Sequence, residues 1–248
     1  MERIAVVTGA DRGLGLALCA GLLAQGWRVF AGQYMPEWPE LSALASQYPH
    51  HLTIVGLDVS SPESVRAAAR AVAESADHVD LLVNNAGVSS PTSVRNIREP
   101  QDYGEMHRLV DVNTLGPLRV VEAFLPLTDR GSMKRLCFVS SEAGSISACE
   151  RKAWYGYCMS KAALNMAVKI TFNHLRPEGY SFRLYHPGWM RTYMSGARGT
   201  QADMEPEEAA VPALAHFLQD RANDPHDPSH ADEDRLVMRD WRGREWPW

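Results

Sequence analysis

The sequence predicts a doubly wound α/β domain, in which helices cover both faces of a parallel sheet, and three observations lead to this fold class. Short apolar runs alternate along the chain with longer segments of helical periodicity. These runs are apolar at consecutive residues, as in strands that are buried on both faces. A glycine-rich turn separates the first run from the first helical segment. Such a sheet binds ligands beyond the carboxyl ends of its strands.

The first half of the chain shows the alternation clearly. A continuous apolar run at residues 4–7 is followed by a helical repeat of leucines that stops near a glycine. Further apolar runs at residues 28–31 and 52–57 predict the second and third strands. An alanine-rich helix is expected at residues 63–75 and begins beside Pro62, because proline favours the first turn of a helix.

The second half continues the pattern with longer helices. The remaining strands are expected at residues 81–83, 135–139, 181–185 and 235–239. The periodicity predicts helices at residues 101–125, 154–175 and 207–218. We find no internal repeat or linker, so residues 1–248 are interpreted as a single domain. The polar stretch at residues 220–234 is expected to form a flexible, solvated loop.

The composition argues against several classes of function. The 248 residues carry a net charge of −5, which argues against a nucleic-acid partner because such binding usually needs a basic face. No apolar run approaches the roughly 18 residues of a membrane span, and no signal peptide is expected. The four cysteines show no CxxC spacing, so we expect reduced thiols, no metal site and a cytoplasmic protein.

The glycine turn at residues 8–15, with the sequence TGADRGLG, indicates a dinucleotide site. Gly9 allows a tight exit from the strand, Gly13 lets the backbone approach a pyrophosphate, and Gly15 lets helix and sheet pack closely. The amino end of the following helix adds unpaired N–H donors and a positive dipole. The alternative is that these are turn glycines of an α/β protein without a cofactor.

Tyr157 and Lys161 provide a second signal, because they lie four residues apart within a predicted helix. Their Cβ atoms are then roughly 5–6 Å from each other. A lysine cation favours phenolate and is expected to lower the pKa of Tyr157 toward the working range, so that the phenol can exchange a proton with a substrate oxygen. Tyr155 is the competing candidate, but Met159 lies four residues beyond it, which favours Tyr157.

In these two motifs the chain resembles the short-chain dehydrogenase/reductase family. The patterns TGxxxGxG at residues 8–15 and YxxxK at residues 157–161 match its single-domain members, and the tail at residues 240–248 is similar to that of C-factor and sniffer-like members. The resemblance implies a Rossmann-like fold and a catalytic tetrad formed by Asn113, Ser141, Tyr157 and Lys161. It also implies that Asn113 holds a water connected to Lys161.

The resemblance further implies which residues contact a nicotinamide dinucleotide. They are expected to be Gly9, Asp11, Arg12, Gly13, Leu14, Gly15, Gln33, Asp58, Val59, Asn85, Ala86, Gly87, Tyr157, Lys161, Pro187, Gly188 and Thr192. Within this set, Asp58 is expected at the adenine and Thr192 at the nicotinamide carboxamide. The NNAG motif at residues 84–87 is expected to stabilise the sheet beside the adenosine.

The end of the second strand favours NADP over NAD. An acid at this place binds the ribose hydroxyls of NAD, whereas this chain has Gln33. Arg12 is placed to meet the additional phosphate of NADP, and a charge-assisted hydrogen bond of this kind is worth roughly 1.5–3 kcal/mol. The alternative is that Arg12 is a solvated turn residue, and Tyr34 stands where family members often have a second basic residue.

The predicted function is that of an NADP-dependent carbonyl reductase or alcohol dehydrogenase. Residues 189–205 are expected to cover the substrate, a hydrophobic or aromatic carbonyl compound or alcohol. Trp154, Trp189, Met190 and Tyr193 are expected to line the substrate pocket, unless they pack this lid against the body of the protein. The two long helices carry more apolar residues than one sheet face needs, which favours a homodimer or homotetramer. The alternative function is a catalytically idle dinucleotide-binding regulator on the same fold.

Overall fold

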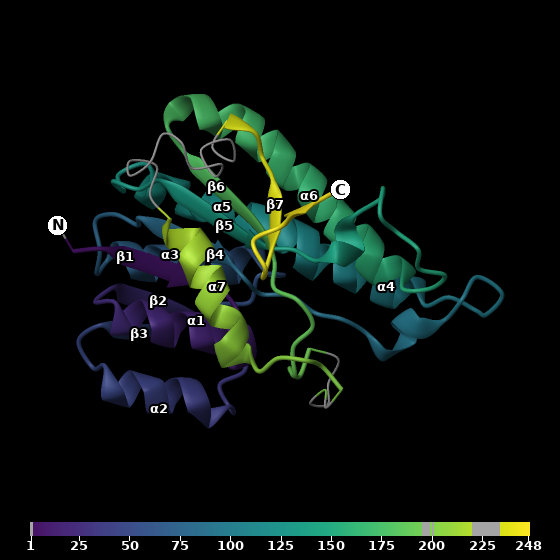
Figure 1. The fold of residues 1–248 in the computed structure, drawn as a ribbon. Coiled ribbons are helices and arrows are strands. Elements are labelled where there is room, and N and C mark those ends of the chain that lie inside the picture. Colours follow the sequence, from purple (N-terminus) through teal and green to yellow (C-terminus); the bar gives the residue numbers. More distant parts are fainter. Residues whose placement is uncertain (1, 195–198, 200, 220–233) are drawn as a thin grey trace.

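The protein is built around one eight-stranded sheet (Figure 1). The computed structural model describes residues 2–194, 199, 201–219 and 234–248. The strands lie in the spatial order β3 (Leu52–Gly56), β2 (Arg28–Gln33), β1 (Ile4–Val7), β4 (Leu81–Asn84), β5 (Arg135–Val139), β6 (Ser181–His186), β7 (Met238–Asp240) and β8 (Glu245–Trp246). Neighbouring strands are parallel except for β7 and β8, which are antiparallel.

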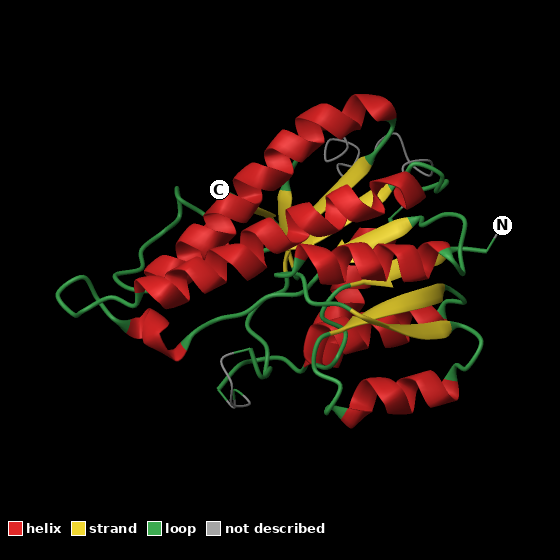
Figure 2. Cartoon of the chain, turned by 180° about the vertical axis from the view of Figure 1, so that it is seen from behind, coloured by secondary structure: helices red, strands yellow, loops and turns green. Residues whose placement is uncertain are grey.

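Helices cover both faces of this sheet, so the predicted doubly wound fold class is confirmed. One face is covered by α1 (Gly13–Ala24), α2 (Pro39–Gln47) and α7 (Pro206–Leu218). The other face is covered by α3 (Pro62–Ala73), α5 (Gly116–Thr128) and α6 (Tyr155–Leu175). Seen from behind, this second set lies in front of the strands (Figure 2).

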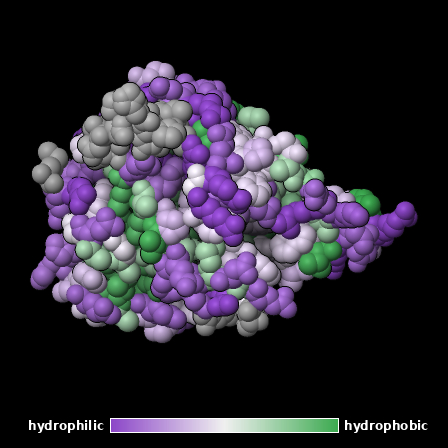
Figure 3. Space-filling view, viewed as in Figure 1, coloured by the Kyte–Doolittle hydropathy of each residue, from purple (hydrophilic) through white to green (hydrophobic). Residues whose placement is uncertain are grey.

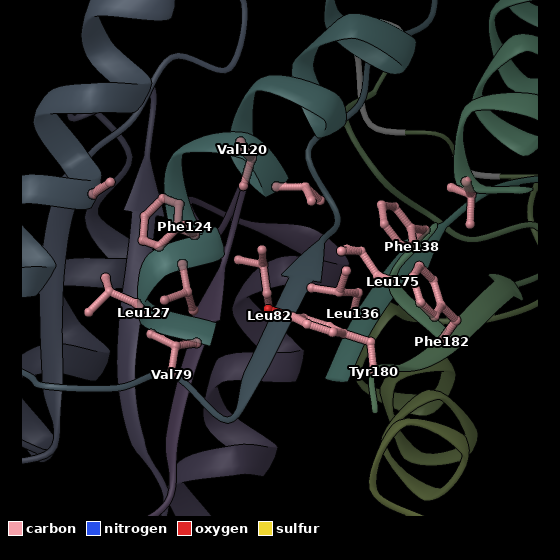
Figure 4. Packing of buried hydrophobic residues seen from close by; sticks show 14 of the residues in the cluster. Val79, Leu82, Val120, Phe124, Leu127, Leu136, Phe138, Leu175, Tyr180 and Phe182 are labelled. Atoms are coloured by element: carbon pink, nitrogen blue, oxygen red, sulfur yellow. The ribbon is translucent and has the colours of Figure 1, made fainter. Parts of the chain in front are cut away.

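Each face of the sheet has its own hydrophobic core. Leu82 belongs to the core beneath α3, α5 and α6, whereas its neighbours Leu81 and Val83 belong to the opposite core. Consecutive side chains of a strand point to opposite faces, which explains why the strands read as continuous apolar runs. Figure 4 shows the first core, where Phe124 approaches from α5 and Phe138 lies on the sheet.

The strand order reverses beside β1, and this reversal positions the candidate site. The chain passes from β1 to β2 and β3 on one side, and then returns to β4 on the other side of β1. Connections that leave β1 and β4 therefore diverge to opposite faces and open a crevice at their carboxyl ends. Thr8 continues β1 at this point and donates its backbone N–H to Val83 O at 3.0 Å.

The long helix predicted at residues 101–125 is interrupted by a π-helical turn. The structure has α4 (Tyr103–Val110), then the π segment Asp111–Leu115, then α5, which extends to Thr128. The backbone N–H of Gly116 donates to Asp111 O, five residues earlier. The sequence does not reveal such a turn, because the segments on either side of it each keep helical periodicity, and the inserted residue only rotates the side chains that follow.

One α-helix and one strand were not predicted, and the last parallel strand begins later than expected. α2 has nine residues, of which only Leu41 is buried, and β8 has two residues, so neither gives a clear periodicity. The last parallel strand begins at Met238, later than the predicted residues 235–239. The loop expected at residues 220–234 lies, apart from Asp234, outside the described residues.

The surface is mainly hydrophilic on the face drawn in Figure 3, with hydrophobic residues in scattered patches. The segment after β4, which contains the 3-10 helix Pro91–Val94, extends from the body beside α4 (Figure 1). None of the described helices combines the length and the apolar character needed to cross a bilayer.

Candidate active site

The glycine turn has a shape that only glycine permits. Gly9 and Gly13 have φ angles of 63° and 59°, in the left-handed region that glycine favours. A Cβ on Gly9 would lie 2.8 Å from Ala86 Cα, and one on Gly15 would lie 2.1 Å from Gly9 O. By contrast, the nearest atom to a Cβ on Gly13 would be Thr192 Cγ2 at 3.6 Å. A Cβ on Gly13 would therefore make only ordinary van der Waals contact with Thr192, so the φ angle, and not crowding, favours glycine at this position.

The amino end of α1 is free to bind an anion. Arg12 stands at the N-cap, where its side chain makes no capping hydrogen bond, and no acidic residue lies in the first turn. The N–H groups of this turn have no partner within the helix, and the helix dipole favours negative charge there. The side chain of Leu14 is buried in the core, so Leu14 offers only its backbone to a ligand. The turn thus fits the pyrophosphate of a dinucleotide.

Asn85 ties the glycine turn to the end of β4. Its Nδ2 donates to Thr8 O at 2.9 Å and to Gly9 O at 3.0 Å. Thr8 Oγ1 in turn accepts the backbone N–H groups of Asn85 and Ala86, each at 3.0 Å. Gly87 follows at the catalytic side, where an added Cβ would lie 3.3 Å from Asn113 Oδ1. Residues 85–87 therefore connect the two halves of the candidate site.

Acidic side chains shape the loops at the expected adenosine end. Asp11 Oδ1 accepts the backbone N–H groups of Tyr34 at 2.9 Å and Met35 at 2.7 Å, which fixes the chain just after Gln33. Asp58 Oδ1 accepts the backbone N–H of Ser60 at 2.8 Å and its hydroxyl at 2.6 Å. Both carboxylates thus stabilise turns. The half-buried side chain of Gln33 lies at the end of β2.

Val59, expected at the cofactor, is buried against α5. A Cβ on Gly116 would lie 2.9 Å from Val59 Cγ2, so the helix approaches closely at this point. The backbone oxygen of Val59 accepts a hydrogen bond from Arg119 Nη1 at 3.2 Å. Val59 therefore packs the helix that carries Asn113 against the end of β3.

Arg12 does not extend into solvent. Its guanidinium carbon lies 4.1 Å from the centre of the Trp38 ring and 5.0 Å from that of Tyr193. Arg12 Nη2 also approaches Tyr193 O at 3.4 Å. The two rings are 4.8 Å apart, centre to centre, and tilted by 58°. The arginine thus links the glycine turn to the segment after β2 and to the segment after β6.

Tyr157 is buried beside Trp154, with the ring centres 6.1 Å apart in an edge-to-face arrangement. Burial raises the pKa of Tyr157 to about 12, and a hydrogen bond with the Ser141 side chain opposes this rise. Ser141 Oγ also accepts the backbone N–H of Ala143 at 3.1 Å. Tyr155 lines a different, small cavity beside α4, together with Met106. The two tyrosines therefore face different surroundings.

Lys161 is buried one turn further along α6. Its Nζ donates to Val139 O at 3.0 Å and lies 5.9 Å from the centre of the Tyr157 ring. Burial lowers the pKa of Lys161 to about 8. The sequence predicts that the lysine lowers the pKa of Tyr157, but desolvation of the phenol is the larger influence on Tyr157 and raises its pKa.

Asn113 lies within the π segment and is fully buried. Its Oδ1 accepts the backbone N–H of Val88 at 2.8 Å, and its Nδ2 donates to Val88 O at 2.9 Å and to Ser160 Oγ at 3.0 Å. The side chain joins the loop after β4 to α6, so its amide is already hydrogen-bonded. A water expected at Asn113 would consequently depend on backbone groups of the π turn.

Of the four residues expected to line a substrate pocket, Trp154 lies beside Tyr157. Trp154 is in the left-handed region with φ 70°, and its backbone N–H donates to Ser93 O at 2.7 Å. Trp189 is 62% exposed, and Met190 packs against the core beneath α1 and α7. The Tyr193 ring lies 5.0 Å from the guanidinium carbon of Arg12, at the glycine turn.

The segment after β6 is held at both ends. Pro187 is buried, and Gly188 has φ 83°. A Cβ on Gly188 would lie 2.9 Å from Trp241, so the carboxyl-terminal strand pair packs directly on this turn. Met190 forms an isolated parallel bridge with Met204, and Arg191 forms an ion pair with Glu205 at 2.9 Å. These contacts position Thr192 over the glycine turn.

Three further residues take part in the site without having been predicted. Thr8 and Ser160 bind backbone or side-chain groups of the predicted residues, and Trp38 packs on Arg12. Thr8 stands in the TGxxxGxG pattern, which offers a signal for it. Trp38 lies between two prolines in the segment after β2, and only the folded path of that segment brings it to Arg12.

Comparison with known proteins decides the family. The family model described as short chain dehydrogenase matches residues 3–203. The chain belongs to this family. The predicted resemblance is therefore confirmed, and the chain is an oxidoreductase of the short-chain dehydrogenase type. Among the described residues, no group of three or more His, Cys, Asp or Glu side chains is arranged to hold a metal ion.

Individual relatives agree with this assignment. The chain is 39% identical over 170 residues, 68% of its length and 93% of the relative, to a Myxococcus xanthus protein called C-signal. It superposes over 100% of both chains on a short-chain dehydrogenase/reductase of Burkholderia multivorans with bound NADP, at TM-score 0.84 and 31% identity. It also superposes on the NADPH-bound carbonyl reductase from chicken fatty liver at TM-score 0.83 and 30% identity, covering 100% and 99% of the chains.

Proposed function

We propose that the protein transfers hydride between NADP(H) and a carbonyl or alcohol substrate, with Tyr157 as the general acid and base. The observation that carries the proposal is the buried group formed by Tyr157, Ser141 and Lys161. This group is connected through Gly87 and Asn85 to a glycine turn with free N–H donors. A proton donor connected to a dinucleotide cradle is the arrangement that carbonyl reduction requires.

The residues at the cradle fit a dinucleotide with an additional phosphate. Gln33 is neutral at the end of β2, and Arg12 supplies a cation at the glycine turn. Two similar solved structures, from Burkholderia multivorans and chicken, hold NADP or NADPH. When bound, the reduced nicotinamide supplies the hydride. Lys161 would bind its ribose, and Thr192 would lie at its carboxamide.

The protonation states favour proton donation to a carbonyl oxygen. With a pKa near 12, Tyr157 is protonated at neutral pH and can donate its proton. Lys161, with a pKa near 8, is then mostly cationic and stabilises the phenolate that forms. The Ser141 side chain lies within hydrogen-bond reach of Tyr157, so its hydroxyl could turn from Tyr157 and donate to the same substrate oxygen.

The surroundings of Tyr157 favour an apolar substrate. The Trp154 ring lies edge-on to the phenol, and the exposed Trp189 follows the turn at Gly188. We therefore propose that the substrate is a hydrophobic or aromatic carbonyl compound or the corresponding alcohol. An aromatic substrate gains both apolar burial and ring contacts at such a site.

We also propose that the chain assembles as a homodimer or homotetramer through α5 and α6. On these helices, Leu118, Met166 and Ile170 are 39%, 60% and 62% exposed. The available surface is smaller than the sequence predicts, because several other apolar residues of the long helices are buried within the protomer: Leu109, Val121, Phe124 and Phe172.

A panel of aromatic ketones, aldehydes and diketones, incubated with the protein and NADPH, tests the proposed reaction. Consumption of NADPH that depends on one of these compounds, with formation of its alcohol, is the expected result. A protein that binds NADPH tightly but reduces nothing in the panel would support the alternative, an idle dinucleotide-binding regulator.

A further inference from the structure

The guanidinium of Arg12 is held between two aromatic rings that come from different parts of the chain. Trp38 lies between β2 and α2, and Tyr193 lies in the segment after β6 that is expected to cover the substrate. The guanidinium carbon is 4.1 Å and 5.0 Å from the two ring centres. Contacts at these distances fall within the range of cation–π attraction. We call the three residues the Arg12 clamp.

In the Arg12 clamp, the two rings lie against the flat faces of the guanidinium and leave the N–H groups at its edges available to a ligand. Aromatic rings interact with the flat faces, whereas the N–H donors point outward in the plane. The only hydrogen bond found for the Arg12 side chain within the described residues is the 3.4 Å contact from Nη2 to Tyr193 O. The remaining donors can therefore bind an anion without breaking the ring contacts.

The described part of the chain offers Arg12 no carboxylate partner. Among the described residues, no ion pair to Arg12 is found, although Asp11 precedes it in the chain. Asp11 is committed to the backbone N–H groups of Tyr34 and Met35. A partly buried cation without an acidic partner, placed beside the end of β2 and the amino end of α1, is suited to bind a phosphate.

We infer that Trp38 and Tyr193 determine cofactor selectivity by positioning Arg12 for the 2′-phosphate of NADP. This inference rests on the proposed function, and it adds two residues that need not touch the cofactor. An unsupported arginine side chain loses conformational entropy when it binds a phosphate. The clamp holds the side chain in position before the phosphate binds. Less conformational entropy is then lost on binding, and the affinity is higher. Tyr193 thereby serves the phosphate end of the site, although it belongs to the segment expected at the substrate.

Calorimetric titration with adenosine 2′,5′-bisphosphate and adenosine 5′-monophosphate tests this inference. The two ligands differ only in the 2′-phosphate, and neither carries the nicotinamide that would reach the substrate side. Tyr193→Ala and Trp38→Ala should each weaken binding of the bisphosphate by roughly 5- to 30-fold. Binding of the monophosphate should stay within about twofold, because neither ring is proposed to contact the shared part of the ligands.

The conservative variants Tyr193→Phe and Trp38→Phe keep a ring on each face of Arg12. They should retain most of the preference for the bisphosphate, whereas Arg12→Ala should abolish it. Thermal unfolding of each variant accompanies the titrations, so that a loss of folded protein is recognised.

The outcomes separate this inference from the proposed function. If the unmodified protein binds both nucleotides equally, the proposed NADP preference fails. If the protein discriminates through Arg12 but both alanine variants keep the full preference, the clamp has no role in selectivity and the inference is overturned. Equal loss of both nucleotides in folded alanine variants would also overturn it, because the rings would then maintain the site in general.

Discussion

At the scale of single residues, burial sets the protonation states of the candidate catalytic pair. Desolvation raises the pKa of Tyr157 to about 12 and lowers the pKa of Lys161 to about 8. Both changes favour the neutral form of the group, as expected where charge is transferred out of water. At neutral pH the pair is therefore a phenol beside a cationic lysine, which is the state that carbonyl reduction needs.

The pH dependence of carbonyl reduction should follow the loss of the proton from Lys161. The cationic form dominates below a pKa of about 8 and declines above it, so turnover should be level at neutral pH and fall as the pH rises beyond about 8. The phenol of Tyr157 stays protonated across this range. The measurement is kcat for carbonyl reduction at saturating NADPH between about pH 6 and 10. A level profile up to pH 10 would indicate a lysine with an ordinary pKa.

The residues of the site differ in how far the sequence predicts them. Tyr157 and Lys161 follow from a spacing within one helix, and Gly9, Gly13 and Gly15 follow from a turn between adjacent elements. Each of these patterns lies within one helix or one turn, so the local backbone geometry already determines how its residues lie relative to one another. The contact of Trp38 and Tyr193 with Arg12 joins segments that are far apart in the chain, and no local pattern encodes it. Tyr193 was accordingly predicted for the substrate pocket, not for the glycine turn.

At the scale of elements, the π segment Asp111–Leu115 connects the two halves of the site. An inserted residue in a helix turns the following side chains and is frequently found at functional sites. Here the segment directs Asn113 toward Val88 on one side and Ser160 on the other. The sequence predicts both the helix and the candidate asparagine, but not the π turn, because the turn depends on tertiary hydrogen bonds.

Replacement of Asn113 by alanine should destabilise the protein. The change removes the partner of two half-buried backbone groups of Val88 and of the buried Ser160 hydroxyl, and a buried polar group left without a partner costs about 1–3 kcal/mol. We expect the free energy of unfolding to fall by roughly 2–5 kcal/mol, measured by urea denaturation. Glu122→Ala, at an exposed site on α5, is the matched control and should change it by less than about 0.5 kcal/mol. Equal stability of Asn113→Ala and the control would contradict the role of this asparagine.

At the scale of the whole molecule, the parallel, doubly wound sheet could be predicted, while the surface could not. Continuous apolar runs separated by helices lead directly to a doubly wound sheet. Whether an apolar residue of a helix faces the sheet or the solvent depends on how the helix is rotated about its axis. An insertion of a single residue changes this rotation. Met166 and Ile170 on α6 are exposed, whereas Phe172 on the same helix is buried.

The proposed assembly predicts a light-scattering mass that is a multiple of 27.5 kDa at micromolar concentration. The double change Met166→Glu and Ile170→Glu introduces charges into the proposed interface and should return the mass to that of one chain. Val211→Glu, at a 69% exposed site on α7, is the control and should leave the assembly intact. A single-chain mass for the unmodified protein would refute the assembly.

The most direct test of the proposed reaction compares two tyrosines on one helix. Tyr157→Phe removes the phenolic proton but keeps the ring beside Trp154, and Tyr155→Phe makes the same chemical change at a side chain that lines a separate cavity. On a carbonyl compound that the unmodified protein reduces, Tyr157→Phe should lower turnover by roughly 10²- to 10⁴-fold while NADPH still binds. Tyr155→Phe should remain close to the unmodified protein. Full turnover in Tyr157→Phe, or its loss in Tyr155→Phe alone, would contradict the assignment of Tyr157 as the proton donor.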